Sequence, residues 1–394
     1  MDDRYFFLNS NDGESLLAVG NETVSFDQIE SLEDIQHFID RNKGKYIFTC
    51  LSYDLKNAIY PLSSENEDVI EFPDALFLIP HTVVRIKDKT IQYEIGEENP
   101  QTTILLKELL NNEELSLELD FKFKARTPKK RYIDQVNSLL SEIQYGNIYE
   151  VNYCQEFYAD NATITDPIRL YHKFNELTST PFSALLKLDD HQVYCGSPER
   201  FIQKTGDRLV SQPIKGTIRR GSTNEEDEDL KSQLLSDPKE RSENVMIVDL
   251  VRNDLSHIAT KGSVDVDELF GIYSFRTVHQ MISTISCTLK EGTSFKDILE
   301  ATFPMGSMTG APKLSAMNLI EQHEDFKRGL YSGSIGYIKP NGDFDLNVVI
   351  RTLIHNQTKN VISCAVGSAI TIQSDPEKEY EECNTKVRTI LDRL

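Results

Sequence analysis

The stretch SGSIGYIKPNGDFDLNVVIRTLIHNQTKNVISCAVGSAITI, residues 332–372, decides the fold class. Apolar and β-branched residues dominate its segments 332–339, 344–354 and 361–372, which therefore predict three strands. Only short polar segments connect them. Antiparallel strands can be joined in this way, whereas a parallel pair needs a long crossover. The stretch thus predicts an α+β fold built on antiparallel sheets, not a doubly wound parallel sheet.

Further strands and helices are predicted on the N-terminal and C-terminal sides of this stretch. Strand patterns occur at 46–51 and 75–86, and a hairpin is indicated at 192–219. Helical spacing occurs at 103–118, from 132 to near 146, at 237–255 and at 375–392. The basic, proline-containing residues 122–131 are the best candidate for a boundary between an N-terminal segment, 1–121, and the remainder of the chain.

Composition excludes several classes of function. The 394 residues include 42 Lys and Arg against 63 Asp and Glu, a formal net charge of −21, which disfavours binding to nucleic acid or to an anionic membrane. No apolar run approaches the roughly 18 residues of a membrane-spanning helix, and the N-terminus has no signal-peptide pattern. The six cysteines are widely spaced without a C-x-x-C pair, so they predict buried thiols in a reducing compartment. We therefore expect a cytoplasmic protein.

A carboxyl and an amine are predicted to approach each other on the hairpin. Glu199 and Lys215 lie almost symmetrically about the turn at 205–207, so folding the hairpin brings them to nearly facing positions. In a cleft, such a pair can act as general acid and nucleophile. A cross-strand salt bridge without any catalytic role remains the alternative.

Two helices each carry a pair of glutamates three residues apart. Glu240 and Glu243 follow one Ser-Asp-Pro sequence, and Glu379 and Glu382 follow another. Residues i and i+3 share a helix face, so each helix can present two carboxylates in one direction. Converging carboxylates suit a hard cation such as Mg²⁺. The alternative is that these acids only complement the helix dipoles.

Three further features are candidates for substrate contacts. The turn at 303–313 contains two glycines, hydroxyl side chains and a proline before an apolar helix, and its free N–H groups could bind a carboxylate. Arg351 interrupts an apolar strand pattern, so it either pairs with a protein carboxylate or grips a substrate carboxylate. His279 lies in a strand-like run, where a structural role is the commoner one.

Taken in order, the motifs of this chain resemble those of the chorismate-utilising enzyme family. They include Ser-Pro-Glu-Arg-Phe, Pro-Ile-Lys-Gly-Thr and Thr-Gly-Ala-Pro-Lys, and the similar segments lie at 146–152, 197–201, 213–217, 243–255, 309–313, 331–337 and 374–382. The resemblance implies an αββα sandwich of two antiparallel sheets with helices outside. It also implies that residues 128–394 form the chorismate-binding region, intertwined with the N-terminal segment.

The resemblance also implies an activity. Lysine at position 215 is typical of the branch that makes 4-amino-4-deoxychorismate for p-aminobenzoate and folate, whereas alanine is typical of the branch that makes anthranilate. Lys215 would add to the chorismate ring while Glu199 protonates the departing hydroxyl, and burial or a nearby cation would lower the pKa of Lys215. A separate glutamine amidotransferase subunit would supply ammonia, because no glutamine-hydrolysing triad is recognisable.

Further residues receive roles from the same resemblance. Mg²⁺ would lie among Glu240, Glu243, Glu379 and Glu382. The substrate would contact the side chains or backbone of Arg351, Tyr331, Gly367, Ser307, Thr217 and His279.

Two departures from the family pattern and three alternatives accompany this interpretation. Ala369 replaces a usual glycine after Gly367, and Ile218 replaces a usual proline. An anthranilate synthase, an isochorismate or salicylate synthase, and a non-catalytic scaffold of the same family remain as alternatives. Lys215 argues against the first, the Pro-Ile-Lys-Gly-Thr motif against the second, and the joint presence of the acidic pairs and Arg351 against the third.

Overall fold

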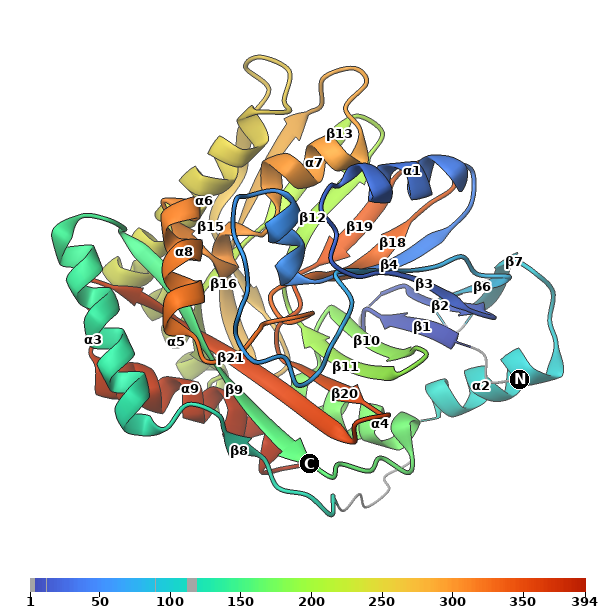
Figure 1. The fold of residues 1–394 in the computed structure, drawn as a ribbon, viewed down its shortest axis with the longest axis horizontal. Helices are drawn as coiled ribbons and strands as arrows, with labels where there is room; N and C mark the ends of the chain where they lie inside the picture. Colours follow the sequence, from blue (N-terminus) through green and yellow to red (C-terminus); the bar gives the residue numbers. More distant parts are fainter. Residues whose placement is uncertain (1–3, 12, 89, 112–118) are drawn as a thin grey trace.

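The computed structural model describes residues 4–11, 13–88, 90–111 and 119–394, and in these it has two large antiparallel sheets (Figure 1). The eleven-stranded sheet runs in the order β17 (Gly310–Ala311), β9 (Glu150–Asp160), β21 (Val361–Thr371), β20 (Thr352–Asn356), β11 (His191–Ser197), β10 (Phe182–Lys187), β1 (Arg4–Asn9), β2 (Ser15–Gly20), β6 (Thr82–Lys87) and β7 (Thr90–Ile95), with β8 (Lys124–Ala125) also on β9. The predicted α+β class is confirmed, because every strand pair described is antiparallel.

The second sheet has ten strands. Its order is β14 (Ile214–Arg219), β16 (Val278–Thr288), β13 (Arg208–Gln212), β12 (Arg200–Thr205), β19 (Phe344–Asn347), β18 (Ser334–Ile338), β4 (Ile47–Leu51), β5 (Ala75–Leu78) and β3 (Thr23–Phe26), with β15 (Asp265–Ser274) also on β16. Both sheets therefore combine strands from residues before 122 with strands from residues after 128.

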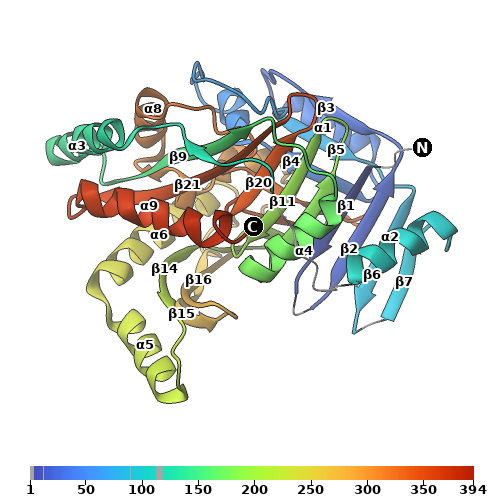
Figure 2. The same ribbon diagram turned by 90° about the horizontal axis from the view of Figure 1, so that it is seen from below.

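Helices cover the outer faces of the sheets. The helical segments are α1 (Glu33–Arg41), η1 (Tyr53–Ala58), α2 (Pro100–Leu110), α3 (Lys129–Tyr145), α4 (Pro167–Thr178), α5 (Asn224–Ser236), α6 (Pro238–Ser256), α7 (Phe295–Thr302), η2 (Gly306–Met308), α8 (Lys313–His323) and α9 (Pro376–Leu391). Helices α3 and α9 pack along β9 and β21, while α5 and α6 contact β14, β15 and β16 (Figure 2).

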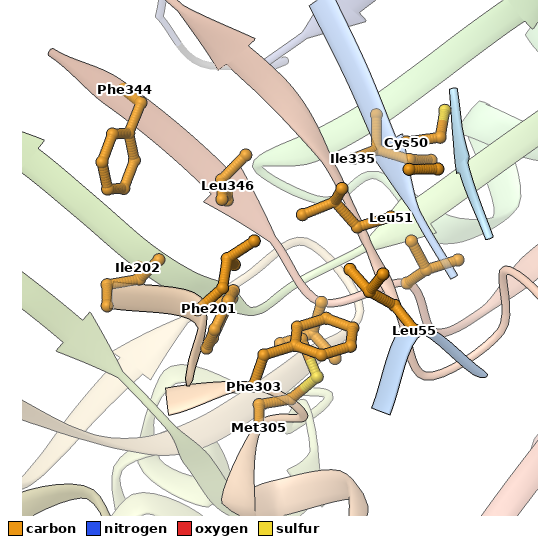
Figure 3. Close-up of a cluster of buried hydrophobic side chains, with 14 of the residues drawn as sticks. Cys50, Leu51, Leu55, Phe201, Ile202, Phe303, Met305, Ile335, Phe344 and Leu346 are labelled. Atoms are coloured by element: carbon orange, nitrogen blue, oxygen red, sulfur yellow. The ribbon is translucent and has the colours of Figure 1, made fainter. Parts of the chain in front are cut away.

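The main hydrophobic core lies between the two sheets. Phe6 and Leu16 from the eleven-stranded sheet pack in the same buried cluster as Phe48 and Leu346 from the ten-stranded sheet. Figure 3 shows part of this cluster, where Phe201, Phe303 and Met305 lie together, and the rings of Phe201 and Phe303 are 6.0 Å apart. The segment that carries η2 is thereby anchored in the core.

Several of the predicted strands are each broken into two. The arms of the hairpin predicted at 192–219 divide into β11 and β12, which belong to different sheets, and into β13 and β14. The run 344–354 forms β19 in one sheet and β20 in the other, and Arg351 lies at the crossing with a φ of 49° rather than inside a strand. The run 75–86 likewise divides into β5 and β6. A continuous apolar pattern does not reveal a change of sheet, because both halves bury their side chains.

The remaining predictions of elements hold with small shifts. Helices α3, α6 and α9 cover the ranges expected for them, and α3 ends at Gly146 with a φ of 82°. The helix expected at 103–118 is α2, which ends at Leu110; its predicted continuation over 112–118 lies outside the described residues. All six cysteines are free and buried, as predicted.

Candidate active site

The predicted functional residues come together around one cavity of about 840 Å³. Strand β14, helices α6 and α9, segment η2 and strand β21 all contribute to its lining. Of the twelve residues singled out in the sequence, eleven line it: Glu199, Lys215, Thr217, Glu240, Glu243, Ser307, Tyr331, Arg351, Gly367, Glu379 and Glu382.

His279 is the predicted residue that the structure places elsewhere. It is fully buried on β16 and bonds to Asp227 of α5 and to Ser274 of β15, each at 2.9 Å. Because successive side chains of a strand point to opposite faces, its neighbour Gln280 lines the cavity instead. The Gln280 Oε1 atom is buried there without a hydrogen-bond partner in the described part of the chain. Gln280 could not be identified from the sequence, because spacing alone does not say which face of this strand meets the site.

Glu199 and Lys215 share the cavity, but not by simple pairing across the hairpin. The register of β12 and β13 ends at Arg200 opposite Gln212, and after Pro213 the chain continues as β14, which pairs with β16. Proline cannot donate a backbone hydrogen bond, so it favours such a break. The predicted proximity is therefore borne out, while the facing register is wrong.

Glu199 has the properties of a general acid. Its side chain is buried, which raises its pKa to about 7, although the nearby polar groups of Ser307 and of the Ile214 backbone and the charge of Lys215 oppose the rise. A carboxyl with such a pKa carries a proton over much of the neutral range, and it can donate that proton to a leaving group.

Lys215 pairs with a carboxylate that the sequence analysis had not assigned. Its Nζ atom donates to Glu150 Oε1 at 2.6 Å, and Glu150 belongs to β9 of the other sheet. Burial alone would lower the pKa of Lys215, but the charges of Glu150, Glu243 and Glu199 outweigh burial and raise it. The predicted lowering of this pKa is therefore wrong for the protein by itself. Glu150 lies 65 positions from Lys215, and no local pattern could have joined the two.

The two glutamate pairs reach the cavity because their helices begin alike. Asp237 and Asp375 each accept hydrogen bonds from two backbone N–H groups of the first turn, and a proline follows each of them at the first helical position. The paired motif therefore sets where each helix starts and which face its glutamates occupy. Burial raises the pKa of Glu243 to about 7 and also raises the pKa of Glu240.

A lysine accompanies the four carboxylates. Lys239 Nζ lies 3.7 Å from Glu243 Oε1, and the charges of Glu243, Glu379, Glu240 and Glu382 raise the pKa of Lys239 against the effect of burial. In the described part of the chain, no three acidic, histidine or cysteine side chains are close enough to hold a metal ion as they stand. The donor set still fits Mg²⁺, because it consists of carboxylate oxygens and because Glu243 Oε1 is buried without a hydrogen bond.

Arg351 presents a half-buried, unpaired guanidinium to the cavity. Its pKa is lowered by burial, and no described side chain forms an ion pair or hydrogen bond with it. The alternative of a protein carboxylate as its partner therefore finds no support. Since an isolated buried charge is costly, this arrangement is typical of a site for an anionic group supplied by a ligand.

Segment η2, which also lines the cavity, is held in place by a buried arginine, Arg328. It donates to the Met308 carbonyl at 2.7 Å and to the Asn152 carbonyl at 2.8 Å, and it pairs with Glu324 at 2.6 Å. These bonds tie η2 to β9, and therefore fix Ser307 relative to the strand that carries Glu150. A Cβ atom added at Gly367 would lie 2.6 Å from Asn152 Oδ1 and 2.8 Å from Cys154 Sγ, so a larger residue there would have to displace these side chains.

The two antiparallel sheets thus bring a carboxyl group, an amine and a guanidinium to one cavity. Such a set of groups suits acid–base chemistry on a small anionic ligand. The model of the family described as "chorismate binding enzyme" matches residues 7–392. The chain belongs to this family, and the resemblance expected from the motifs is confirmed. Among the described residues, none of the helices is both long and apolar enough to cross a membrane.

Individual relatives agree with this assignment. The chain is 37% identical over 370 residues to an aminodeoxychorismate synthase of Arabidopsis thaliana, covering 88% of this chain and 40% of that protein. It is 34% identical over 347 residues to aminodeoxychorismate synthase component 1 of Escherichia coli, covering 85% and 75% respectively. The chain thus spans less than half the length of the plant relative.

A solved structure shows the same architecture. Anthranilate synthase component I from Streptococcus pneumoniae superposes with a TM-score of 0.80 at 25% identity, covering 98% of this chain and 90% of that one. The predicted sandwich of two antiparallel sheets is confirmed.

Proposed function

We propose that this chain converts chorismate and ammonia to 4-amino-4-deoxychorismate through an intermediate bound to Lys215. The observation that carries the proposal is the placement of Lys215 in one cavity with Glu199, whose pKa is about 7. The names of the Arabidopsis and Escherichia coli relatives support the same activity.

In the proposed reaction, Lys215 Nζ forms a bond to ring carbon C2 as the ring double bonds shift. The C4–O bond breaks, and Glu199 gives its proton to the departing oxygen, so that water leaves. Ammonia then attacks C4 and the C2–N bond breaks, which returns the lysine amine. Splitting one displacement into two easier ones is the usual advantage of a covalent intermediate.

The remaining cavity residues would hold the substrate. Arg351 has the free guanidinium that a carboxylate needs, and Tyr331 and the backbone near Gly367 line the same part of the cavity. Thr217 would contact the substrate from β14 and Ser307 from η2. Glu240, Glu243, Glu379 and Glu382 would hold Mg²⁺, which when bound supplies positive charge for the second carboxylate of the substrate.

Ammonia would come from a separate glutamine amidotransferase subunit. The relatives named component 1 imply that a second component exists. We expect the isolated chain to use ammonium salts but not glutamine. Robust glutamine-dependent turnover by this chain alone would contradict the proposed partner. We place the reaction in the cytoplasm, as cysteine usage indicates.

Product analysis tests the proposal. Wild-type protein should convert chorismate, Mg²⁺ and an ammonium salt to aminodeoxychorismate, identified by chromatography and mass. Held with chorismate but without ammonia, it should gain mass on the peptide that contains Lys215. Formation of anthranilate or isochorismate instead would favour the alternatives named above.

The variant Lys215→Ala separates the nucleophile from a mere ion-pair partner. We expect it to bind chorismate while losing aminodeoxychorismate formation by orders of magnitude, because the covalent route is closed. Residual product should come from direct attack of ammonia or water at C2. A variant that makes aminodeoxychorismate at close to the wild-type rate would show that Lys215 is not the nucleophile.

A further inference from the structure

Glu150 is the buried carboxylate that the reaction proposed above leaves without a role. Its side chain is 2% exposed, and Oε1 accepts the hydrogen bond from Lys215 Nζ at 2.6 Å. Its other oxygen, Oε2, is buried without a hydrogen-bond partner among the described residues. A buried carboxylate with one unsatisfied oxygen is costly, so an ion pair built only for stability would be expected to satisfy both oxygens.

The position of Glu150 places it behind the lysine as seen from the cavity. Lys215 lines the cavity, whereas Glu150 is absent from its lining and comes from β9 of the other sheet. A ligand in the cavity would therefore meet Lys215 and not Glu150. The carboxylate can act on a substrate only through the lysine nitrogen that it touches.

Lys215 needs a proton acceptor before it can attack. Three carboxyl groups act on its ammonium: Glu150 from β9, Glu199 from the turn between β11 and β12, and Glu243 from α6, with Glu240 and Glu382 acting from farther away. Together they favour the charged lysine, which has no lone pair to donate. Glu199 must itself enter the reaction protonated, and Glu243 belongs to the set proposed for Mg²⁺. Glu150 is the remaining group, and it is already in hydrogen-bond contact.

We propose that Glu150 is the general base that removes a proton from Lys215 Nζ and returns it after the lysine is released. This inference rests on the function proposed above and assigns a further catalytic residue to it.

Two carboxyl groups balance the protons of the reaction: Glu150 first accepts a proton, and Glu199 first donates one. One proton moves from Lys215 Nζ to Glu150, leaving a neutral amine and a neutral carboxyl. The amine bonds to C2, and Glu199 gives a proton to the departing hydroxyl. When ammonia bonds to C4 and the C2–N bond breaks, Glu199 takes a proton from the new C4 ammonium. Glu150 returns its proton to Lys215, so both groups are reset after one turnover.

The test is the rate of Lys215 adduct formation in a single turnover with chorismate and Mg²⁺ but no ammonia. Glu150→Gln keeps the size and a hydrogen-bond acceptor but cannot take the proton. We expect the rate near pH 7 to fall by about 100-fold or more, the usual range for a general base, with the chorismate Kd unchanged. The deficit should shrink as pH rises, because the lysine can then lose its proton to solvent.

Two companion variants guard against a folding artefact. Glu156→Gln removes a buried carboxylate from the same strand, where it pairs with Arg126 away from the cavity, and it should leave the adduct rate unchanged. Glu150→Asp keeps a carboxylate one methylene farther from Nζ, so its rate should lie between those of wild type and Glu150→Gln. If the Gln variant does not fold, a wild-type rate in the Asp variant overturns the proposal.

The other outcomes are equally clear. An adduct rate in Glu150→Gln that equals or exceeds the wild-type rate would show that Glu150 only neutralises Lys215. A loss that is the same at every pH and parallels weaker chorismate binding would show a structural role. A wild-type adduct that leads to a different product overturns the proposed function but not the role of Glu150. Absence of any wild-type adduct overturns both.

Discussion

At the scale of single residues, the chemistry depends on how unequally the site treats its carboxyl groups. Glu199 is buried against η2, and burial raises its pKa to about 7, whereas Glu150 forms an ion pair with Lys215. Two acids of the same type can thus serve as proton donor and proton acceptor. Environments that separate two titratable groups in this way are a mark of acid–base catalysis.

The rate should therefore depend on pH through Glu199. An ordinary glutamate has a pKa of about 4.3, and the raised value keeps the acid form available up to about pH 7. At saturating Mg²⁺, we expect the rate to fall by about tenfold per pH unit above that value, as the fraction of protonated Glu199 falls. The pH profile of kcat with ammonia held constant measures this.

Glu199→Gln is the control for that profile, since glutamine has no proton to lose in this range. The variant should be much slower and should lose the limb near pH 7. If the limb persists in Glu199→Gln, another group is responsible for it.

Spacing along the sequence anticipates short-range geometry and fails over long range. The hairpin symmetry placed Glu199 near Lys215, and the paired Ser-Asp-Pro motifs placed both glutamate pairs. Glu150 could not be assigned in this way, because it reaches Lys215 from the other sheet. His279 and Gln280 differ only in which face of β16 they occupy, and this is decided by packing against α5.

At the scale of elements, the site depends on two helices that bring like charges together. Helices α6 and α9 each supply two glutamates to the cavity, where Lys239 lies 3.7 Å from Glu243 and Lys386 pairs with Glu382 at 2.7 Å. Because this cluster of carboxylates is negatively charged, it needs additional positive charge before it can accept an anionic ligand.

Removing one of these carboxylates should weaken metal binding. We expect Glu243→Gln to raise the Kd for Mg²⁺, measured by calorimetry without substrate, and to weaken chorismate binding with it. Excess chelator should abolish turnover by the wild-type protein. Full activity in chelator would rule out the proposed metal role, and Glu377→Gln, on the exposed side of α9, provides a control that should bind Mg²⁺ normally.

A second element-scale prediction concerns the link between η2 and β9. Arg328→Met removes a fully buried charge that pairs with Glu324; it leaves that carboxylate with the Cys154 N–H as a donor but no cation, and two backbone carbonyls without the Arg328 donor. Breaking such a buried pair should lower the free energy of unfolding by about 3–5 kcal/mol. Denaturant titration measures the loss.

The double variant Arg328→Met with Glu324→Gln should recover part of this stability, because no unpaired charge then remains. If Arg328→Met unfolds at the wild-type denaturant concentration, the link contributes little to the fold.

At the scale of the whole molecule, the N-terminal third is part of both sheets. Strands β1 and β2 extend the eleven-stranded sheet beyond β10, and β4 and β5 extend the ten-stranded sheet beyond β18. Strand patterns predicted sheet-forming segments on both sides of residues 122–131, but not this order, because the choice of neighbouring strand is made by contacts distant in sequence. The splitting of 344–354 between the sheets escaped prediction for the same reason.

A chain that starts at Lys122 should therefore fail to fold. It would expose β10 and β18 as new edges and would open the core that Phe6, Leu16 and Phe48 help to fill. We expect no cooperative thermal transition by circular dichroism and rapid proteolysis, in contrast to the full chain. A truncated chain that melts cooperatively and binds chorismate would show that residues 128–394 are an independent unit.

Arg351 lowers the stability of the folded protein while it provides a group for binding an anion. A residue other than glycine held at a φ of 49° costs about 1–2 kcal/mol, and a half-buried guanidinium without a partner among the described side chains adds to that cost. Replacing it by glycine would relieve both burdens while removing the group that is free to grip an anion. Screening variants of this protein for heat resistance alone would therefore reward the loss of this side chain, so laboratory evolution of a hardier form needs selection for turnover at the same time.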